Sequence, residues 1–581
     1  MKRVMHIIRL SSVLLVTSLL YVSCGEKETL KPDGPTDNDK VTFYQSDGII
    51  RYIDYSALDS IVNGADVTKY YFNDKRVACY SKRMLDSVSY KYPSGKTILA
   101  FPVASDFLSD IADAQAPAQT DKAEPGAPSD ETAPDYGDYI ENYTVKTTLT
   151  FTWTEDGVTV SGTVPKGVTI SKDKGHVTVQ STQKKMRYRL EGSTTDGSFK
   201  IADMDNSSTD DNNKKFILEL NGVEITNPNG PAINIQSGKR VLVNMPKDKV
   251  NTLKDGAAYT ETEGESQKGT FFSEGQLIFS GPGTLNVTSL GGHGICSDDY
   301  IRLRYNLGEI NITSAKDGFN TKDYFLMYGG KVKVNATGDG VTVRRGSFEL
   351  YGGTVDINCV DDGVVSDYVN ADTAFIKIGG GSLNIFTTGP KGHAVTTTGK
   401  LTLDKAVVTA STQGAASKCF TAGGNITISS SYVNLSTKGD PQYDEDEKDW
   451  SSAACIRAKS GLSVTGSDLF LLSSGKGSKC INAAAGVNLD GSTLTLAAKG
   501  SDYDGDGNNV RSRAIDAVSL TVNDGTTVCI SAAMTAIYAD TKFDVKGGNT
   551  FAYTQSEDAK AVNVKGTYSQ TGGLVMSGLS K

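Results

Sequence analysis

The clearest candidate for ion chemistry is a short acidic loop near the C-terminal end of the sequence. It carries oxygen-bearing side chains at alternate positions: Asp502, Asp504, Asp506 and Asn508. Carboxylate and amide oxygens wrapped around a glycine-rich turn are the ligands that Ca²⁺ prefers, so this spacing predicts calcium as the bound ion. An EF-hand loop would continue to a glutamate where this chain has Arg513. A simple solvated turn is the alternative.

A second set of carboxylates recurs at a spacing of 22 residues. It consists of Asp317, Asp339 and Asp361, with Asp362 as the alternative for the third position. If one coil of chain takes about 22 residues, these carboxylates align in a column on one face. Stacked like charges repel, so the column favours a bound cation or basic neighbours. The alternative is that Asp-Gly pairs simply make good turns.

Aromatic residues accompany two acidic insertions. Tyr443 and Trp450 lie in the insertion at residues 439–450, and Tyr503 lies in the calcium-type loop. If both insertions leave the fold on the same side, the three rings line a groove and can stack on the apolar faces of sugar rings. Local packing of the rings against their own loops is the alternative.

The segments between these loops repeat. Apolar–polar–apolar alternations, typical of half-buried strands, recur at 285–287, 310–312, 332–334, 355–357 and 383–385. Apolar residues that each follow a small residue form a second register: Ile295, Phe319, Val341, Val364, Val395, Phe420, Ile456, Ile481, Ile515, Ile537 and Val562. Coils of about 22–24 residues predict an all-β solenoid, a right-handed parallel β-helix. The preceding small residues include Cys419, Cys455 and Cys480, which we expect to be buried structural residues.

The first residues are typical of an export signal. Basic Lys2 and Arg3 precede an apolar run that ends at Ser23-Cys24-Gly25. This end resembles the bacterial lipobox, in which the cysteine carries the lipid, and the next residues resemble the acidic surface-export tag of Bacteroidetes lipoproteins. The resemblance implies lipidation of Cys24 and a surface-exposed position on the outer membrane. Tyr21 departs from the lipobox, so a conventional signal peptide is the alternative.

Composition divides the rest of the chain. We predict a signal peptide at 1–24, a linker at 25–40 and a small N-terminal module of unknown role at 41–111. Residues 112–143, rich in Ala, Pro, Asp and Thr, predict a disordered linker, and residues 144–581 form the β-helix. The formal charge of −9 argues against a nucleic-acid partner. We expect a monomer.

Several segments together resemble the bacterial β-helical carbohydrate-binding domains that share their fold with pectate lyases. They are the entry segment 218–225, the turn 251–256 and the glycine-acid units 294–299, 318–323 and 338–341. The resemblance covers about residues 145–581. It implies polysaccharide as the partner, with calcium at acidic loops and uronate-containing glycans as candidate ligands.

Polysaccharide binding is one of three functions compatible with these patterns. The second is a polysaccharide lyase, in which Arg344 or Arg345 beside Asp339 would abstract the proton next to a uronate carboxylate. The third is an adhesin or structural stalk. We favour binding because the acidic residues are spread over many coils and no single coil concentrates acid, base and metal ligands.

Overall fold

The computed structural model describes residues 40–44, 50–82, 87–89, 98–202, 215–445, 448–505 and 508–580. Cys24 and the segment before Lys40 lie outside these residues. The described chain forms two compact units. One comprises residues Ala118–Ala410, and the other combines residues up to Pro117 with those from Ser411 onward. Within the described residues, no helix is long and apolar enough to cross a membrane.

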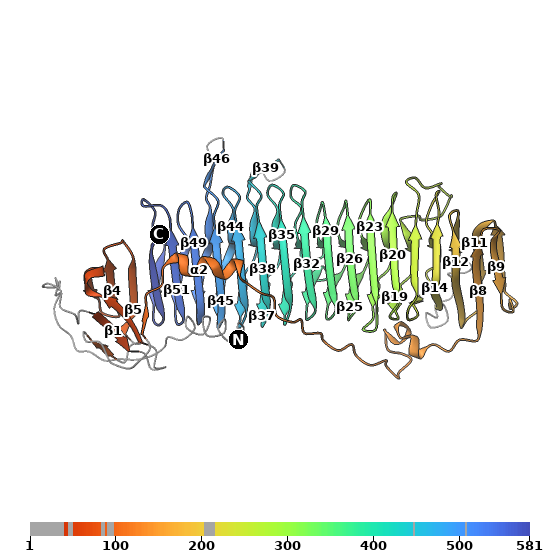
Figure 1. Cartoon of the computed structure of the whole chain (residues 1–581), viewed down its shortest axis with the longest axis horizontal. Helices are drawn as coiled ribbons and strands as arrows, with labels where there is room; N and C mark the ends of the chain where they lie inside the picture. Colours follow the sequence, from red (N-terminus) through yellow and green to blue (C-terminus); the bar gives the residue numbers. More distant parts are fainter. Residues whose placement is uncertain are drawn as a thin grey trace. The chain divides into compact units, whose positions relative to one another are not determined.

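The unit of residues 118–410 is built from short strands stacked in parallel, as Figure 1 shows. One column of strands contains β20 (Thr284–Ser289), β23 (Glu309–Ser314), β26 (Lys331–Ala336), β29 (Thr354–Cys359) and β32 (Ser382–Thr387). In this column Leu285, Ile310, Val332, Val355 and Leu383 are paired in register. The first predicted register is therefore confirmed.

Two further strand columns complete each coil of this unit. The column that carries the second register consists of β21 (His293–Ser297), β24 (Phe319–Thr321), β27 (Val341–Val343), β30 (Val364–Ser366) and β33 (Val395–Thr397). The third consists of β22 (Ile301–Leu303), β25 (Tyr324–Met327), β28 (Ser347–Leu350), β31 (Phe375–Ile378) and β34 (Leu401–Asp404). Alternate side chains point inward and stack on the coils above and below, so the apolar core follows the stack.

Parallel stacking in this unit begins well before β20. The strand β12 (Met186–Thr194) pairs in parallel with β8 (Thr147–Thr154) and with β14 (Phe216–Thr226). Antiparallel partners lie at the start of the stack, where β9 (Gly157–Ser161) pairs with β8 and β10 (Val168–Asp173) pairs with β11 (Gly175–Ser181). These hairpins occupy the strand edges that the first coils would otherwise expose.

Residues 118–143, here called the strap, correct the sequence prediction of a disordered linker. The strap lies along the coils of its own unit, and the backbone N–H of Lys122 donates to the carbonyl oxygen of Tyr351 at 2.7 Å. Tyr139 and Asp138 of the strap are fully buried. The composition is too polar to form a core by itself, but its charges pair with arginines of the coils, as described below.

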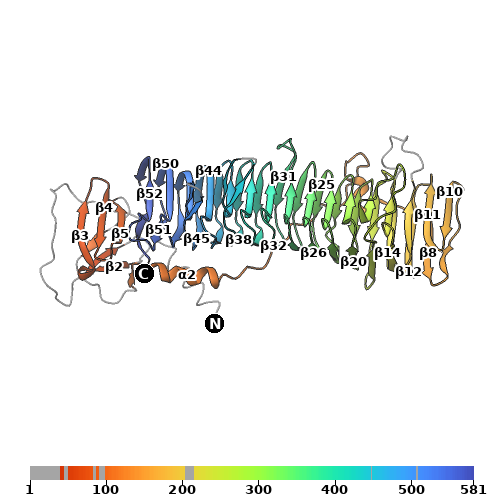
Figure 2. The same ribbon diagram turned by 90° about the horizontal axis from the view of Figure 1, so that it is seen from above.

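The second unit is also built as a parallel β-helix, as its strands in Figure 2 show. Its core column contains β36 (Lys418–Ala422), β41 (Ala454–Ala458), β44 (Lys479–Asp490), β48 (Arg513–Val522), β50 (Ile537–Val545) and β52 (Val562–Val564). The predicted register is confirmed by the pairing of Phe420, Ile456, Ile481, Ile515, Ile537 and Val562. As expected, Cys419, Cys455 and Cys480 are buried.

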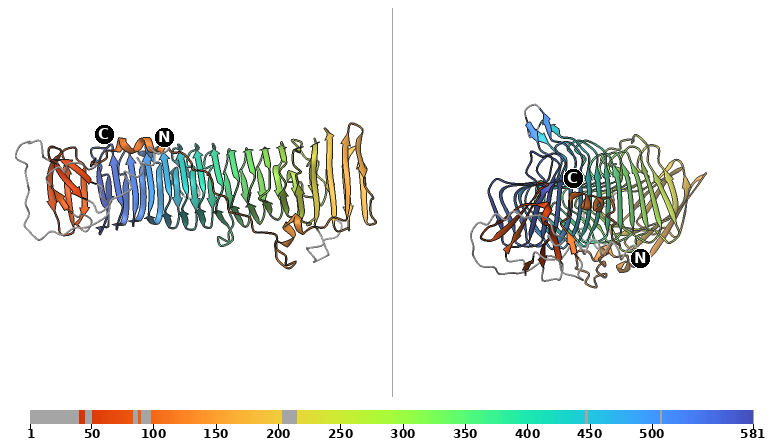
Figure 3. Two further views of the ribbon diagram at one scale, coloured as in Figure 1. Left: turned by 60° about the horizontal axis from the view of Figure 1, so that its bottom comes forward. Right: turned by 60° about the vertical axis from the view of Figure 1, so that its left-hand side comes forward.

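The small N-terminal module is present and caps the last coil of this unit (Figure 3). The strands β3 (Leu58–Asn63), β4 (Val67–Phe72) and β5 (Val77–Ser81) form an antiparallel sheet, and β5 pairs with β54 (Leu574–Leu579). Two more pairs, β1 (Lys40–Tyr44) with β2 (Ile50–Asp54) and with β6 (Ser87–Ser89), lie beside them, and β7 (Ile98–Ala100) pairs with β2. The helix α2 (Ala104–Ala112) packs the ring of Phe107 against that of Phe551, with ring centroids 5.3 Å apart. The module therefore covers the final strand edge.

Candidate functional site

Two hairpins project from coils of the second unit that are separated by one intervening coil, and a strand of each is labelled in Figure 1. One pairs β39 (Gln442–Asp444) with β40 (Asp449–Ser451), and the other pairs β46 (Tyr503–Gly505) with β47 (Asn508–Val510). In the first hairpin Tyr443 faces Trp450 directly across the strands, with ring centroids 5.7 Å apart. The Trp450 ring also lies 5.0 Å from the Tyr503 ring of the other hairpin. The two insertions therefore bring all three aromatic residues together.

This aromatic cluster of Tyr443, Trp450 and Tyr503 is packed but still reaches solvent. Tyr443 is 38% exposed, and the other two rings are half-buried. A Cβ atom at Gly505 would lie 2.4 Å from the Tyr503 ring and 3.0 Å from Trp450. Glycine at this position thus lets the rings approach. Local packing and an exposed aromatic surface coexist, and such a surface suits the apolar face of a sugar ring.

The acidic residues of the second hairpin have different surroundings. Asp502 accepts hydrogen bonds from the Arg511 guanidinium at 2.7 Å and from the backbone N–H of Ser512 at 2.9 Å. Its carboxylate therefore closes the base of the hairpin. Asp504 is exposed, whereas Asp506 and the side chain of Asn508 lie outside the described part of the chain. Among the described residues, no group of three His, Cys, Asp or Glu side chains is arranged to hold a metal ion. Calcium binding stays a prediction.

The spaced carboxylates form a ladder at the beginning of the β21 to β33 column. The Oδ1 atom of Asp317 accepts the backbone N–H of Asp339 at 3.2 Å, and Oδ1 of Asp339 accepts the backbone N–H of Asp362 at 2.9 Å. Oδ1 of Asp362 accepts the backbone N–H of His393 at 2.5 Å. Each carboxylate therefore ties its coil to the next one.

The third rung of this ladder is Asp362, so the alignment of Asp361 with the column was wrong. Asp361 is exposed. The strand register pairs Val341 with Val364, which makes this coil one residue longer than the coil before it. Counting 22 residues from Asp339 therefore ends at Asp361, one residue before the aspartate that joins the ladder.

Burial sets the charge of the ladder. It is the main cause that raises the pKa of Asp339 to about 6, with the charge of Asp317 adding to it, and it raises the pKa of Asp362 to about 8. Burial acts in the same direction on Asp317, but the imidazole of His293, 3.3 Å from its Oδ2 atom, outweighs it and the pKa of Asp317 is lowered. Near neutral pH the ladder is therefore only partly charged. This reduces the repulsion expected between three stacked carboxylates.

The sequence of the chain matches one known protein family. Residues 173–477, more than half of its 581 residues, match a family described as carbohydrate-binding domain-containing protein. The chain belongs to this family. The matched region of this carbohydrate-binding domain protein includes Tyr443, Trp450 and the carboxylate ladder. Tyr503 lies beyond it.

A solved structure of a polysaccharide lyase-like protein from C. thermocellum is also similar. The match has 21% sequence identity and a TM-score of 0.34, and it covers 51% of this chain and 95% of the other. A comparison with the curated proteins found no match.

The two arginines considered for a lyase differ in their surroundings. Arg344 donates a hydrogen bond of 2.7 Å to Asp298, which also accepts one of 2.6 Å from Lys268. Burial acts to raise the pKa of Asp298, but these hydrogen bonds outweigh it and the pKa is lowered. Arg344 is therefore engaged in an ion pair with Asp298. Asp339 precedes β27, whereas Arg344 follows that strand. Arg345 is exposed.

Proposed function

We propose that this protein binds polysaccharide through the aromatic cluster of its two hairpins. The observation that carries the proposal is the position of Trp450, whose ring contacts Tyr443 in its own hairpin and Tyr503 in the other. Aromatic faces bind the C–H surface of pyranose rings without requiring charge, and partly exposed rings on projecting hairpins are accessible to a long chain. Membership of a carbohydrate-binding domain family supports the same function.

Replacement of the central ring tests this proposal. Trp450→Ala should weaken binding to the preferred polysaccharide at least tenfold, measured by affinity electrophoresis against a panel of neutral and acidic polysaccharides. The matched control is Tyr568→Ala, which removes another partly exposed ring, 41% exposed, of the same unit. Equal binding by Trp450→Ala, Tyr568→Ala and the unchanged protein would overturn the proposal.

We further propose that calcium assists binding and that uronate-containing glycans are among the ligands. The alternate spacing of Asp502, Asp504 and Asp506 supports this idea, as does the exposure of Asp504. A bound divalent ion would offset the negative charge of the protein and could bridge it to a carboxylate of the glycan.

We also propose that the protein is held at the bacterial surface by a lipid on Cys24. The support is the apolar run and the Ser23-Cys24-Gly25 sequence at its end. Cys24→Ser should release the protein into the soluble fraction of fractionated cells. A variant that is still processed and stays with the membrane would refute lipid anchoring.

A further inference from the structure

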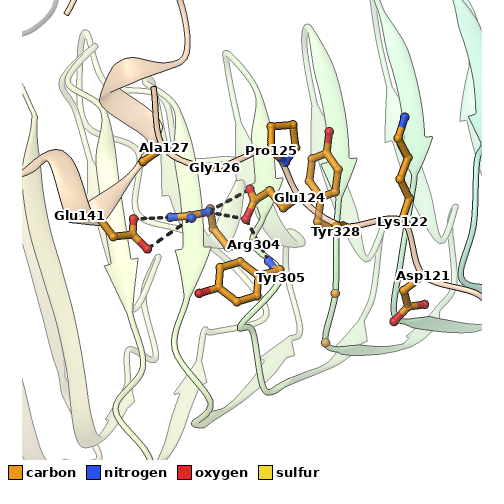
Figure 4. A pocket seen from close by; sticks show the side chains of 13 residues that line it. Asp121, Lys122, Glu124, Pro125, Gly126, Ala127, Glu141, Arg304, Tyr305 and Tyr328 are labelled. Atoms are coloured by element: carbon orange, nitrogen blue, oxygen red, sulfur yellow. Dashed lines mark hydrogen bonds and ion pairs between the residues drawn. The ribbon is translucent and has the colours of Figure 1, made fainter. Parts of the chain in front are cut away.

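A cavity of about 580 Å³ lies between the strap and two turns of the β-helix, both within the unit of residues 118–410. Strap residues 121–127 form one wall. The opposite wall is formed by Arg304 and Tyr305, which follow β22, and by Tyr328, Gly329 and Gly330, which follow β25. Figure 4 shows the Tyr305 and Tyr328 rings on this side, with Glu124 between the strap and Arg304. Ligand cavities in proteins have similar volumes, roughly 300–1,000 Å³.

The buried charges of Glu124 and Arg304 in the cavity wall are already paired. Glu124, whose side chain is 2% exposed, accepts hydrogen bonds from Arg302 at 2.8 Å and from Arg304 at 2.9 Å. Arg304 also donates to Glu141 at 3.0 Å. An anionic ligand would have to compete with these two carboxylates for the guanidinium group. The wall therefore favours a ligand without net charge.

The same contacts hold the strap in place before any ligand arrives. Asp138 of the strap, fully buried, pairs with Arg302 and with Arg240, each at 3.0 Å. The strap backbone is also bound at Lys122, as described above. A wall that is already fixed loses little conformational entropy on binding.

The opposite wall offers aromatic surface and unused hydroxyl groups. Tyr305 is 57% exposed, and Tyr328 stacks on Tyr351 with ring centroids 5.1 Å apart. Within the described chain, neither the Tyr305 nor the Tyr328 hydroxyl makes a hydrogen bond to another residue. A ring face with a free hydroxyl at its edge matches the apolar face and the equatorial hydroxyl groups of a pyranose.

We propose that this cavity is a second carbohydrate-binding site, for a short neutral oligosaccharide of pyranose units. This inference rests on the proposed function, because it assigns carbohydrate, the ligand proposed for the hairpins, to a second site. The strap wall lies before residue 173, outside the family-matched region. The site therefore depends on the segment that this chain adds in front of that region.

Calorimetric titration with neutral β-linked tetrasaccharides of glucose, mannose, xylose and galactose tests the site. The unchanged protein should bind at least one of them at two sites per chain. Tyr305→Ala, at an exposed position that leaves the coils intact, should abolish one site or weaken it at least tenfold. Tyr305→Phe keeps the ring and should retain the site with a smaller loss. In the unchanged protein, the sugar should also slow amide hydrogen exchange in strap residues 121–127.

The variants separate this inference from the hairpin proposal. Loss of all binding in Trp450→Ala, with no change in Tyr305→Ala, overturns the cavity site and leaves the hairpin site standing. Loss in Tyr305→Ala alone supports the cavity site and overturns the hairpin site for that sugar. Failure of the unchanged protein to bind any of the four sugars overturns the cavity site, and binding of acidic polysaccharide by the same preparation would show that the hairpin proposal survives.

Discussion

The backbone N–H of Asp362 donates a 2.9 Å hydrogen bond to the Oδ1 atom of Asp339 on the preceding coil. The bond links two acidic residues whose pKa values burial raises to about 8 and about 6. Both lie well above the ordinary value of 3.8, so the folded chain holds protons that the unfolded chain releases. The stabilising effect is complete below about pH 4 and is lost as the pH rises through 6 and 8.

Stability should therefore fall with rising pH across this window. Each carboxyl contributes a slope of at most about 1.4 kcal/mol per pH unit. Asp317, with its lowered pKa, acts in the opposite direction only at pH values near and below 3.8. Asp362→Asn keeps an oxygen acceptor for the His393 N–H and should flatten the dependence between pH 6 and 8 in chemical denaturation. The exposed neighbour provides the control, because Asp361→Asn should keep the slope. An unchanged slope in Asp362→Asn would contradict the shifted pKa.

Removal of Glu124 should release the strap. Glu124→Ala leaves the buried Arg302 and Arg304 short of a carboxylate, and breaking a buried ion pair in this way costs about 3–5 kcal/mol. The loss should appear as rapid protease cleavage within residues 118–143 while the coils remain folded. Glu309→Gln breaks the more exposed pair with Lys333 and should leave the cleavage rate unchanged. Protection of the strap in Glu124→Ala would show that other contacts hold it.

The small-residue corner of the second unit should not accept a larger side chain. Ala514 is fully buried next to Ile515, which is paired on both sides. Ala514→Leu should overpack the corner and lower the free energy of unfolding by about 1–3 kcal/mol. Val518→Leu enlarges a partly exposed residue of the same strand and should change it by less than about 0.5 kcal/mol. The same denaturation midpoint for Ala514→Leu and the unchanged protein would refute the tight corner.

Calcium should bind at the second hairpin. The double variant Asp504→Ala, Asp506→Ala should lose the heat of calcium binding in calorimetry. Chelation should weaken binding of uronate-containing glycans more than that of neutral ones, because only the former need a bridging cation. Asp502 is left unchanged in this double variant, because Asp502→Ala would also break the ion pair with Arg511 that closes the base of the hairpin. No heat together with chelator-insensitive binding would refute the metal bridge, and growing ultraviolet absorbance of unsaturated uronide products would indicate a lyase.

The sequence by itself determined the coils and their register. In a solenoid each coil contacts mainly the next one, so a repeat read along the chain is also a contact in space. The pairing of Ile456 with Ile481 and of Val332 with Val355 could therefore be predicted from spacing alone. The approach of the aromatic insertions followed from the same reasoning, because equivalent positions on nearby coils face the same way.

Only the tertiary structure decided how the polar segments are used. The sequence of the strap does not show what it packs against, because Glu124 and Asp138 pair with arginines more than one hundred residues further along the chain. No local pattern reports such pairs. The choice of Asp362 over Asp361 likewise depended on one additional residue in a coil, which shifts the register that strand pairing fixes. The folded chain decides these matters because buried charges are stabilised by distant partners, whereas apolar repeats are stabilised by their nearest coils.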